Sequence, residues 1–284
     1  MLRDNNYFGR FIDRRFKNVF NKKVSNSTRD NNKVIIAITN VTCNLKCFKC
    51  STFCDTDIGS NIYNKDAFIL KPVILNEFLE NISDYRPDYY ISLQGGETTL
   101  LNPDIINEYS KVIKDNNRKV LCLTNGYGIR KLNPFLFDVI ILDEHMQNKN
   151  DIKLAINYFE SVGYRDYTIN ITRYHCDFRS VMKDNRIVND FKCSDMFDAI
   201  TLFNKVVFPC CVSPMLMGYD NRIDYVNDLK SNGFIYDNKD LSKMLNNIET
   251  FLPDSFNDVC LNYCYRRKIK AKKIYKPTDY KKIK

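Results

Sequence analysis

Three closely spaced cysteines are the residues in this chain best suited to chemistry. Cys43, Cys47 and Cys50 have C-x3-C-x2-C spacing and follow an apolar run at residues 34–38. Three thiolates can hold a four-iron cluster and leave one iron open to an exchangeable ligand, whereas a closed zinc site usually has a fourth ligand. Cys54 is available as that ligand. The spacing therefore predicts a 4Fe-4S cluster with one open iron, with a closed zinc site as the alternative.

The elements that position these cysteines are predicted to be strands alternating with helices. Apolar strand patterns occupy residues 33–39, 89–94, 119–123, 137–142 and 167–172. Helical periodicity begins at Pro72 and at the Asn102-Pro103 pair, and a third helical pattern ends at Gly163. The residues expected on the three helix faces are Ile74, Phe78 and Ile82, then Ile105, Tyr109 and Val112, then Ile152, Ile156 and Phe159. Because parallel neighbours need crossover connections, this alternation predicts an α/β fold with a parallel sheet.

Polar motifs follow the later strands, as the cysteines follow the first. In parallel α/β folds, ligand-binding residues gather at the carboxyl ends of the strands. These ends carry Gly95-Gly96-Glu97, Thr124-Asn125-Gly126, Asp143-Glu144-His145, and the pair Arg173 and His175. We therefore expect these motifs to meet the cysteine loop at one edge of the sheet.

The order of these motifs resembles that of the radical SAM superfamily, over residues 33 to about 190. The resemblance implies a partial (β/α)6 TIM-like barrel of parallel strands. It also implies that Cys43, Cys47 and Cys50 hold a 4Fe-4S cluster whose fourth iron binds S-adenosylmethionine. One electron, from a low-potential donor such as flavodoxin or ferredoxin, would then cleave this cofactor to a 5'-deoxyadenosyl radical that removes a substrate hydrogen.

The same resemblance implies roles for the polar motifs. Gly95, Gly96 and Glu97 would face the methionyl ammonium, a cation that a carboxylate can bind directly. Thr124 and Asn125 would lie near the ribose or the methionyl carboxylate. The organic chemistry belongs to the cofactor, so the protein has to position it and exclude water.

A second group of cysteines follows the predicted sheet. Two β-rich runs at residues 199–208 flank Asn204-Lys205 and predict a hairpin that returns the chain beside its start. A helix with Leu241, Leu245 and Ile248 on one face is expected after the hairpin. The thiols around these elements are Cys193, Cys210, Cys211, Cys260 and Cys264. Four of them could converge on one metal site, with a structural zinc or unligated thiols as the alternatives.

This layout resembles the Twitch extension, the short form of the SPASM domain. The resemblance implies one auxiliary 4Fe-4S cluster, bound by Cys193, Cys210, Cys260 and Cys264. Pro209 comes before Cys210, which favours Cys210 over Cys211 as the ligand at the end of the hairpin. The expected organisation is a basic amphipathic extension at 1–32, the barrel at 33–190, the Twitch-like domain at 191–264 and a basic tail at 265–284.

Composition indicates a globular protein of a reduced compartment with basic ends. The 284 residues are 44% hydrophobic, enough for a core, and no apolar run reaches the length of a membrane span. Eleven cysteines without a secretory leader favour metal ligation in the cytoplasm over a disulfide framework. Residues 265–284 hold ten Lys or Arg and one Asp, equal to the whole net charge of +9. This tail is either a solvated segment or a contact for an acidic partner.

Three classes of function fit these expectations. The first is oxidation of a small polar metabolite, as in Twitch-bearing aminocyclitol dehydrogenases, in which the auxiliary cluster accepts an electron. Such a reaction needs a base, and Arg173, His175 and His145 are candidates for substrate binding or proton removal. The second class is modification of a peptide or protein by a radical SAM maturase. The third is an iron-sulfur module for binding or electron transfer that never cleaves S-adenosylmethionine.

Overall fold

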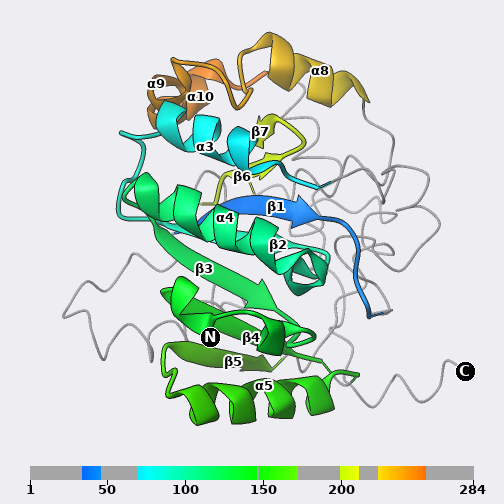
Figure 1. Ribbon diagram of the computed structural model, residues 1–284. Coiled ribbons are helices and arrows are strands. Elements are labelled where there is room, and N and C mark those ends of the chain that lie inside the picture. Colours follow the sequence, from blue (N-terminus) through cyan, green and yellow to red (C-terminus); the bar gives the residue numbers. More distant parts are fainter. Residues whose placement is uncertain (1–33, 46–68, 146, 172–198, 211–222, 254–284) are drawn as a thin grey trace, which may run out of the picture.

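The computed structural model describes residues 34–45, 69–145, 147–171, 199–210 and 223–253 (Figure 1). A seven-stranded sheet with the order β5-β4-β3-β2-β1-β6-β7 forms the centre of this part of the chain. The strands are β1 Val34–Asn40, β2 Tyr90–Gly95, β3 Lys119–Thr124, β4 Val139–Glu144, β5 Tyr167–Ile171, β6 Thr201–Phe203 and β7 Val206–Phe208.

The first five strands are parallel and lie side by side in sequence order. This confirms the predicted parallel α/β sheet, and the strand bounds differ from the predicted ones by at most two residues. In the described part of the chain the sheet is open. A sixth repeat of the predicted (β/α)6 barrel would follow β5 at residues 172–198, outside the described residues, so the complete barrel stays a prediction.

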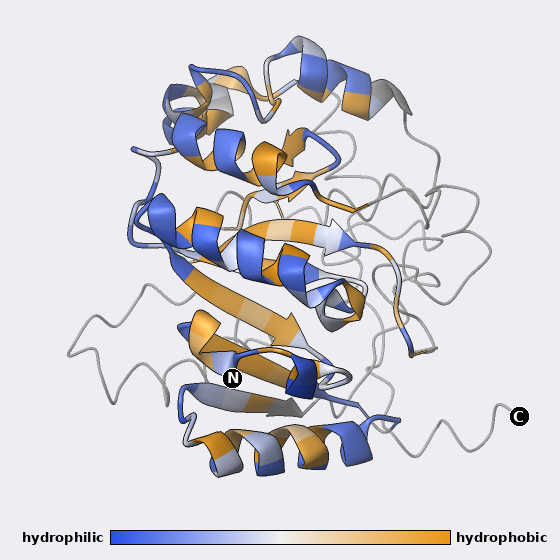
Figure 2. Ribbon diagram, viewed as in Figure 1, coloured by the Kyte–Doolittle hydropathy of each residue, from blue (hydrophilic) through white to orange (hydrophobic). Residues whose placement is uncertain are grey.

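Three α-helices pack on one face of this sheet: α3 Pro72–Asn81, α4 Pro103–Asp115 and α5 Lys149–Val162 (Figures 1 and 2). The predicted start and stop signals operate as expected. Asn102 Oδ1 accepts a hydrogen bond from the Asp104 amide at 3.0 Å, and Gly163 ends α5 in the left-handed conformation at φ 77°. Between β3 and β4 the connection instead forms two 3-10 turns, Ile129–Lys131 and Pro134–Leu136.

The buried face of α4 is one residue away from the predicted face. Ile106, Tyr109 and Ile113 are fully buried, whereas Ile105 and Val112 are only partly buried. The Tyr109 hydroxyl donates a hydrogen bond to the Leu70 carbonyl, which fixes the rotation of the helix. An apolar stripe of a helix is broad enough for both lines of residues, and tertiary packing decides which line lies at its centre.

The sheet core is apolar on the side that the helices cover. Alternate residues of the central strands are fully buried there, among them Ile35, Ile91, Val120 and Ile140. Figure 2 shows most of the length of these strands as hydrophobic. The residues between them, such as Ile36 and Leu121, are buried as well, and parallel strands buried on both faces have this continuous apolar character.

The predicted hairpin is confirmed. β6 and β7 are antiparallel and joined by Asn204 and Lys205, both with positive φ, as a two-residue turn of this kind requires. β6 pairs in parallel with β1, so the hairpin does return the chain beside its start.

The prediction that Leu241, Leu245 and Ile248 belong to a single helix is wrong. The three side chains are buried, but they belong to two short helices, α9 Leu241–Asn246 and α10 Ile248–Phe251. Asn247 breaks the helix at φ −123° and ψ 37°. Asparagine is a weak helix former, which makes it a suitable residue for the break. The helix before this pair is α8 Ile223–Ser231.

Among the described residues, no helix is both long enough and apolar enough to span a bilayer. The predicted N-terminal extension at 1–32 and basic tail at 265–284 lie outside this part of the chain. Their proposed roles stay predictions.

Candidate active site

The cysteine loop and the Gly95-Gly96-Glu97 turn meet at the carboxyl edge of the sheet. β1 ends at Asn40, three residues before Cys43, and it pairs with β2 along most of its length. Beyond the strands, the Gly96 amide donates to the Asn40 carbonyl at 2.9 Å, and the Glu97 amide donates to the Thr42 carbonyl at 2.7 Å. Backbone hydrogen bonds therefore hold the start of the cysteine loop against this turn.

The two glycines permit this close approach. A Cβ atom on Gly96 would lie 2.0 Å from the Thr42 carbonyl oxygen, and one on Gly95 would lie 2.2 Å from the Asn40 carbonyl oxygen. Gly95 also has φ 144°, which favours glycine. Both glycines are thus needed to seat the cysteine loop, a requirement separate from the cofactor contact that the sequence predicts.

Glu97 links the ends of β2 and β3 through its buried carboxylate. Oε1 accepts hydrogen bonds from the Thr99 amide at 3.1 Å, the Thr99 hydroxyl at 2.8 Å and the Thr124 hydroxyl at 2.6 Å. Oε2 accepts from the Asn125 amide at 2.7 Å. The side chain predicted to bind a ligand cation therefore also has a structural role.

The electrostatic state of Glu97 follows from this setting. Burial raises the pKa of Glu97, and the hydrogen bonds from Thr124, Asn125 and Thr99 act in the opposite direction. Among the described residues, Oε2 receives one hydrogen bond, and a carboxylate oxygen has room for a second. A cationic donor at that oxygen would favour the ionised form.

Asn125 brings the end of β3 to the cysteine loop. Its Nδ2 donates to Asn44 Oδ1 at 2.9 Å and lies 3.7 Å from Cys43 Sγ. Its Oδ1 accepts from the Tyr127 amide at 2.9 Å, which fixes the amide plane. The structure thus brings together Cys43, Gly95, Gly96, Glu97, Thr124 and Asn125, as the sequence predicts.

Asn148 is a residue of this edge that the sequence did not reveal. It is fully buried, and its Nδ2 donates to the carbonyls of Asn125 and Asp143, at 2.8 Å each. Its Oδ1 accepts from the His145 amide at 2.6 Å. Asn148 stands immediately before α5, so its sequence position suggests only a helix cap. The side chain instead connects the ends of β3 and β4.

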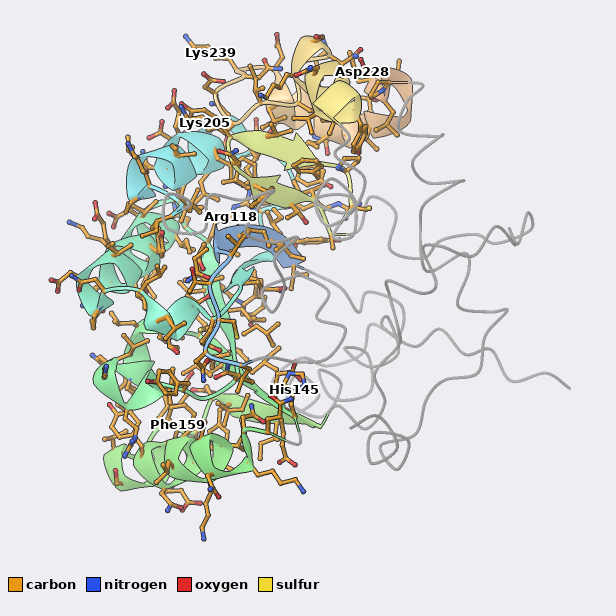
Figure 3. All side chains as sticks on the ribbon, turned by 90° about the vertical axis from the view of Figure 1, so that its right-hand side faces the viewer. Arg118, His145, Phe159, Lys205, Asp228 and Lys239 are labelled. Atoms are coloured by element: carbon orange, nitrogen blue, oxygen red, sulfur yellow. The ribbon has the colours of Figure 1, made fainter. Side chains whose placement is uncertain are left out.

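His145 lies beside a carboxylate at the end of β4. Its Nε2 is 3.2 Å from Asp143 Oδ2, and the two side chains are 18% and 23% exposed. Figure 3 shows His145 on the side of the sheet away from Phe159 of α5. A histidine held by a carboxylate can act as a general base. Because Nε2 faces Asp143, the ring would accept a proton at Nδ1, which is buried in this structure. The other two candidates, Arg173 and His175, lie outside the described residues.

Only two of the predicted metal ligands, Cys43 and Cys210, fall within the described ranges. Within those ranges, no three His, Cys, Asp or Glu side chains are grouped so that they could hold a metal ion. Cys47, Cys50, Cys193, Cys260 and Cys264 lie outside, as does Cys211, so the ligand sets stay predictions. Cys122 is fully buried, and burial raises the pKa of its thiol, which suits an inert core residue.

Cys210 lies at the opposite edge of the sheet from Cys43. β6 runs parallel to β1 with Thr201 beside Ile36, and β7 runs back with Phe208 beside Thr201. Cys210, two residues beyond Phe208, is therefore near the amino edge, roughly 20 Å from Cys43 at about 3.3 Å per strand residue. Metal–sulfur bonds are about 2.3 Å long, so these two thiols cannot share one metal site.

Known structures provide a comparison for this arrangement. No protein-family model matches the chain, and no curated protein matches it. The structure of BtrN in complex with AdoMet and 2-DOIA is similar over 81% of this chain and 87% of BtrN, with a TM-score of 0.52 and 15% sequence identity.

Two further structures are less similar. AdoMet-bound anSMEcpe matches over 48% of this chain and 43% of its own, with a TM-score of 0.37 and 17% identity. Streptococcus suis SuiB bound to precursor peptide SuiA matches over 66% of this chain and 60% of its own, with a TM-score of 0.36 and 13% identity. At 15% identity, the likeness to BtrN shows a shared fold. The parallel sheet and this likeness show that the chain has the fold of AdoMet-bound BtrN.

Proposed function

We propose that this chain is a radical SAM enzyme that reductively cleaves S-adenosylmethionine and abstracts a hydrogen atom from a small polar metabolite. The observation that carries this proposal is the hydrogen-bonded junction of Cys43, Glu97 and Asn125 at one edge of the sheet. A zinc loop would require none of the contacts that hold Glu97 and Asn125 beside the cysteine loop.

The residues of this edge suit the cofactor in their chemistry. Cys43, with Cys47 and Cys50, would hold a 4Fe-4S cluster, and Asn125 would fix the orientation of the Cys43 side of the loop. When bound, the cluster would supply the electron that cleaves S-adenosylmethionine. Glu97 would offer Oε2 to the methionyl ammonium, while Gly95 and Gly96 keep the loop close enough for both contacts.

Dehydrogenation of an alcohol is the reaction that the described residues favour. Removal of a hydroxyl proton needs a base, and the His145–Asp143 pair lies at the same edge as Cys43. Asn148 links that pair to Asn125, so the base and the cofactor turn are positioned by one side chain. The similar BtrN structure contains AdoMet and 2-DOIA, which is consistent with a small polar substrate.

A second, auxiliary 4Fe-4S cluster belongs to this proposal. Cys210 follows the β6–β7 hairpin near the amino edge of the sheet. This hairpin and the helices after it are the elements that a Twitch domain would need. Cys193, Cys260 and Cys264 would complete its ligands. After hydrogen abstraction and loss of the hydroxyl proton to the base, the cluster would accept one electron from the substrate radical, which leaves the carbonyl product. Two oxygen-sensitive clusters and free thiols suit the reducing cytoplasm.

One assay tests the central proposal. The protein is reconstituted anaerobically with iron and sulfide, and 5'-deoxyadenosine is measured after addition of S-adenosylmethionine and dithionite. We expect product from the wild type and from Cys122→Ala, a matched control that removes a buried core thiol. Cys43→Ala should form none. Absence of product from the fully reconstituted wild type would refute the enzyme proposal in favour of a binding or electron-transfer module.

A further inference from the structure

The sulfur of Cys43 lies beside two N–H donors of the protein. The Leu45 amide nitrogen is 3.4 Å from Cys43 Sγ, and Asn125 Nδ2 is 3.7 Å from the same atom. Sulfur is a weak hydrogen-bond acceptor in a thiol and a stronger one when it carries negative charge. Two donors at one sulfur therefore suit a Cys43 thiolate that is bound to a metal.

The side chain of Asn125 is fixed in the orientation that this contact needs. Its Oδ1 accepts a hydrogen bond from the Tyr127 amide at 2.9 Å, so Nδ2 faces the cysteine loop. An amide nitrogen carries two hydrogens. One is donated to Asn44 Oδ1 at 2.9 Å, which leaves the other for Cys43 Sγ. Asn44 Oδ1 also lies 3.9 Å from this sulfur.

The backbone of Asn125 is held by two further hydrogen bonds. Its amide donates to Glu97 Oε2 at 2.7 Å, and its carbonyl accepts from Asn148 Nδ2 at 2.8 Å. Asn125 is only 6% exposed, so water screens its side-chain dipole very little. A donor that is buried and already fixed acts strongly on a nearby charge, because no reorganisation is needed.

We propose that Asn125 is a positioning residue whose hydrogen bond to Cys43 Sγ raises the reduction potential of the cluster that Cys43 would help to bind. This inference rests on the proposed function and concerns the electron that starts its reaction. One electron passes from the low-potential donor, which is oxidised, to the cluster, which is reduced. The added negative charge is shared with the sulfur ligands, so a hydrogen bond to sulfur stabilises the reduced form more than the oxidised form.

The contacts of Asn125 favour this role over direct binding of the cofactor. The sequence implies that Asn125 lies near the ribose or the methionyl carboxylate of S-adenosylmethionine. Both hydrogens of Nδ2 have acceptors within the described protein, so a carboxylate would have to displace one of them. The side chain is therefore better placed to act on the Cys43 sulfur.

Redox titration of the anaerobically reconstituted protein, followed by electron paramagnetic resonance, tests this role. The first cluster is identified in the wild type by the signal that changes when S-adenosylmethionine is added. Asn125→Ala removes the donor, so the ratio of reduced to oxidised first cluster should fall about threefold at a fixed applied potential. For a one-electron couple, this equals a decrease of roughly 30 mV in the midpoint potential, at about 59 mV per tenfold change.

Asn44→Ala should shift the midpoint potential in the opposite direction. It removes the oxygen that shares Nδ2 with Cys43 Sγ, and that oxygen places negative partial charge near the sulfur. The side chain of Asn44 is exposed, so its loss should be tolerated by the fold. This second variant keeps the proposal testable if Asn125→Ala binds too little iron for a titration.

Asn238→Ala is the matched control. Asn238 Nδ2 also donates to a carbonyl and a sulfur, those of Gly233 at 2.7 Å and Met244 at 3.1 Å, but this sulfur belongs to a methionine. The variant should lose stability and keep the wild-type midpoint potential of the first cluster. Unchanged potentials in both Asn125→Ala and Asn44→Ala would overturn the proposal and leave the radical SAM assignment intact. A wild type without a signal that responds to S-adenosylmethionine would overturn both.

Discussion

At the level of single residues, Glu97 combines a structural and a proposed ligand-binding task. Three donors converge on Oε1, whereas Oε2 accepts one hydrogen bond within the described part of the chain. Removal of the Glu97 charge would therefore affect both the β2–β3 connection and cofactor binding. A pH series separates the structural task from the ligand-binding task, because only the pairing with the methionyl ammonium requires an ionised carboxylate when the cofactor binds.

The affinity for S-adenosylmethionine should fall as the pH is lowered through the folded-state pKa of Glu97. Burial raises that pKa, so the decline begins above the ordinary glutamate range of about 4.3. Below the folded-state pKa the protonated carboxyl must lose its proton before it pairs with the ammonium, which costs about tenfold in affinity per pH unit. Calorimetric titration between pH 5 and 8 measures this; Glu97→Gln should bind weakly, with a flat profile. Parallel pH profiles for both proteins would contradict the assignment.

Asn148→Asp should destabilise the carboxyl edge of the sheet, although the two side chains have the same shape. The two donors to the Asn125 and Asp143 carbonyls are lost, and a charge is placed against both oxygens. We expect a loss of about 2 kcal/mol in the free energy of unfolding, together with weaker S-adenosylmethionine binding. Chemical unfolding and calorimetry measure the two effects. Asn107→Asp on the exposed side of α4 is the control and should leave both quantities within error of the wild type.

At the level of elements, the site depends on how closely the cysteine loop packs on the turn after β2. The loop and the turn are joined by backbone hydrogen bonds from Gly96 and Glu97, and Asn40 Nδ2 returns one to the Glu97 carbonyl at 3.0 Å. Nothing larger than a hydrogen atom fits between Gly96 and Thr42. The position of Cys43 is therefore set by an element far from it in sequence.

Gly96→Ala should displace the cysteine loop and lower iron binding at the first site. The added Cβ would lie 2.0 Å from the Thr42 carbonyl oxygen, which only a backbone shift can relieve. The iron content per chain, measured after anaerobic reconstitution, should fall by the four irons of the first cluster. Gly163→Ala is the matched control, because no atom lies within 4 Å of its added Cβ although φ is 77°. It should cost about 1 kcal/mol in stability and retain all its iron. Equal iron loss in both variants would show a general folding defect.

At the level of the whole molecule, the sheet separates two thiol sites. β1 runs from the amino edge, near which Cys210 lies, to the carboxyl edge with Cys43. The two proposed clusters would therefore lie at opposite ends of the strands. This separation would suit a reaction in which hydrogen is removed at one edge and an electron leaves toward the other.

Replacement of Cys43, Cys47 and Cys50 together by Ala should leave four irons per chain. The remaining iron would belong to the auxiliary cluster, whose proposed ligand Cys210 is roughly 20 Å away and independent of the first loop. Further replacement of Cys210 should reduce the count, whereas replacement of Cys211 should not. Anaerobic iron and sulfide analysis provides the measurement. A triple variant without iron would refute the auxiliary cluster.

The sequence alone determined the parallel α/β sheet, the helix boundaries at Asn102 and Gly163, and the set of motifs at the carboxyl edge. These depend on local signals, namely hydrophobic period, capping residues and the rule that ligands gather where parallel strands end. The β6–β7 hairpin was predictable for the same reason, because Asn204-Lys205 suits a two-residue turn.

Only the tertiary structure decided which side chains meet across strands. Asn148 looks like a helix cap in sequence, and its links to Asn125, Asp143 and His145 exist only once β3 and β4 are paired. Ser92 and Thr201 share a row only because β6 is in register with β1. Register is a property of packed strands, and a shift of one residue would turn these side chains to the other face. The sequence thus specified the cysteine and glycine motifs, and packing determined which side chains meet at the carboxyl edge of the sheet.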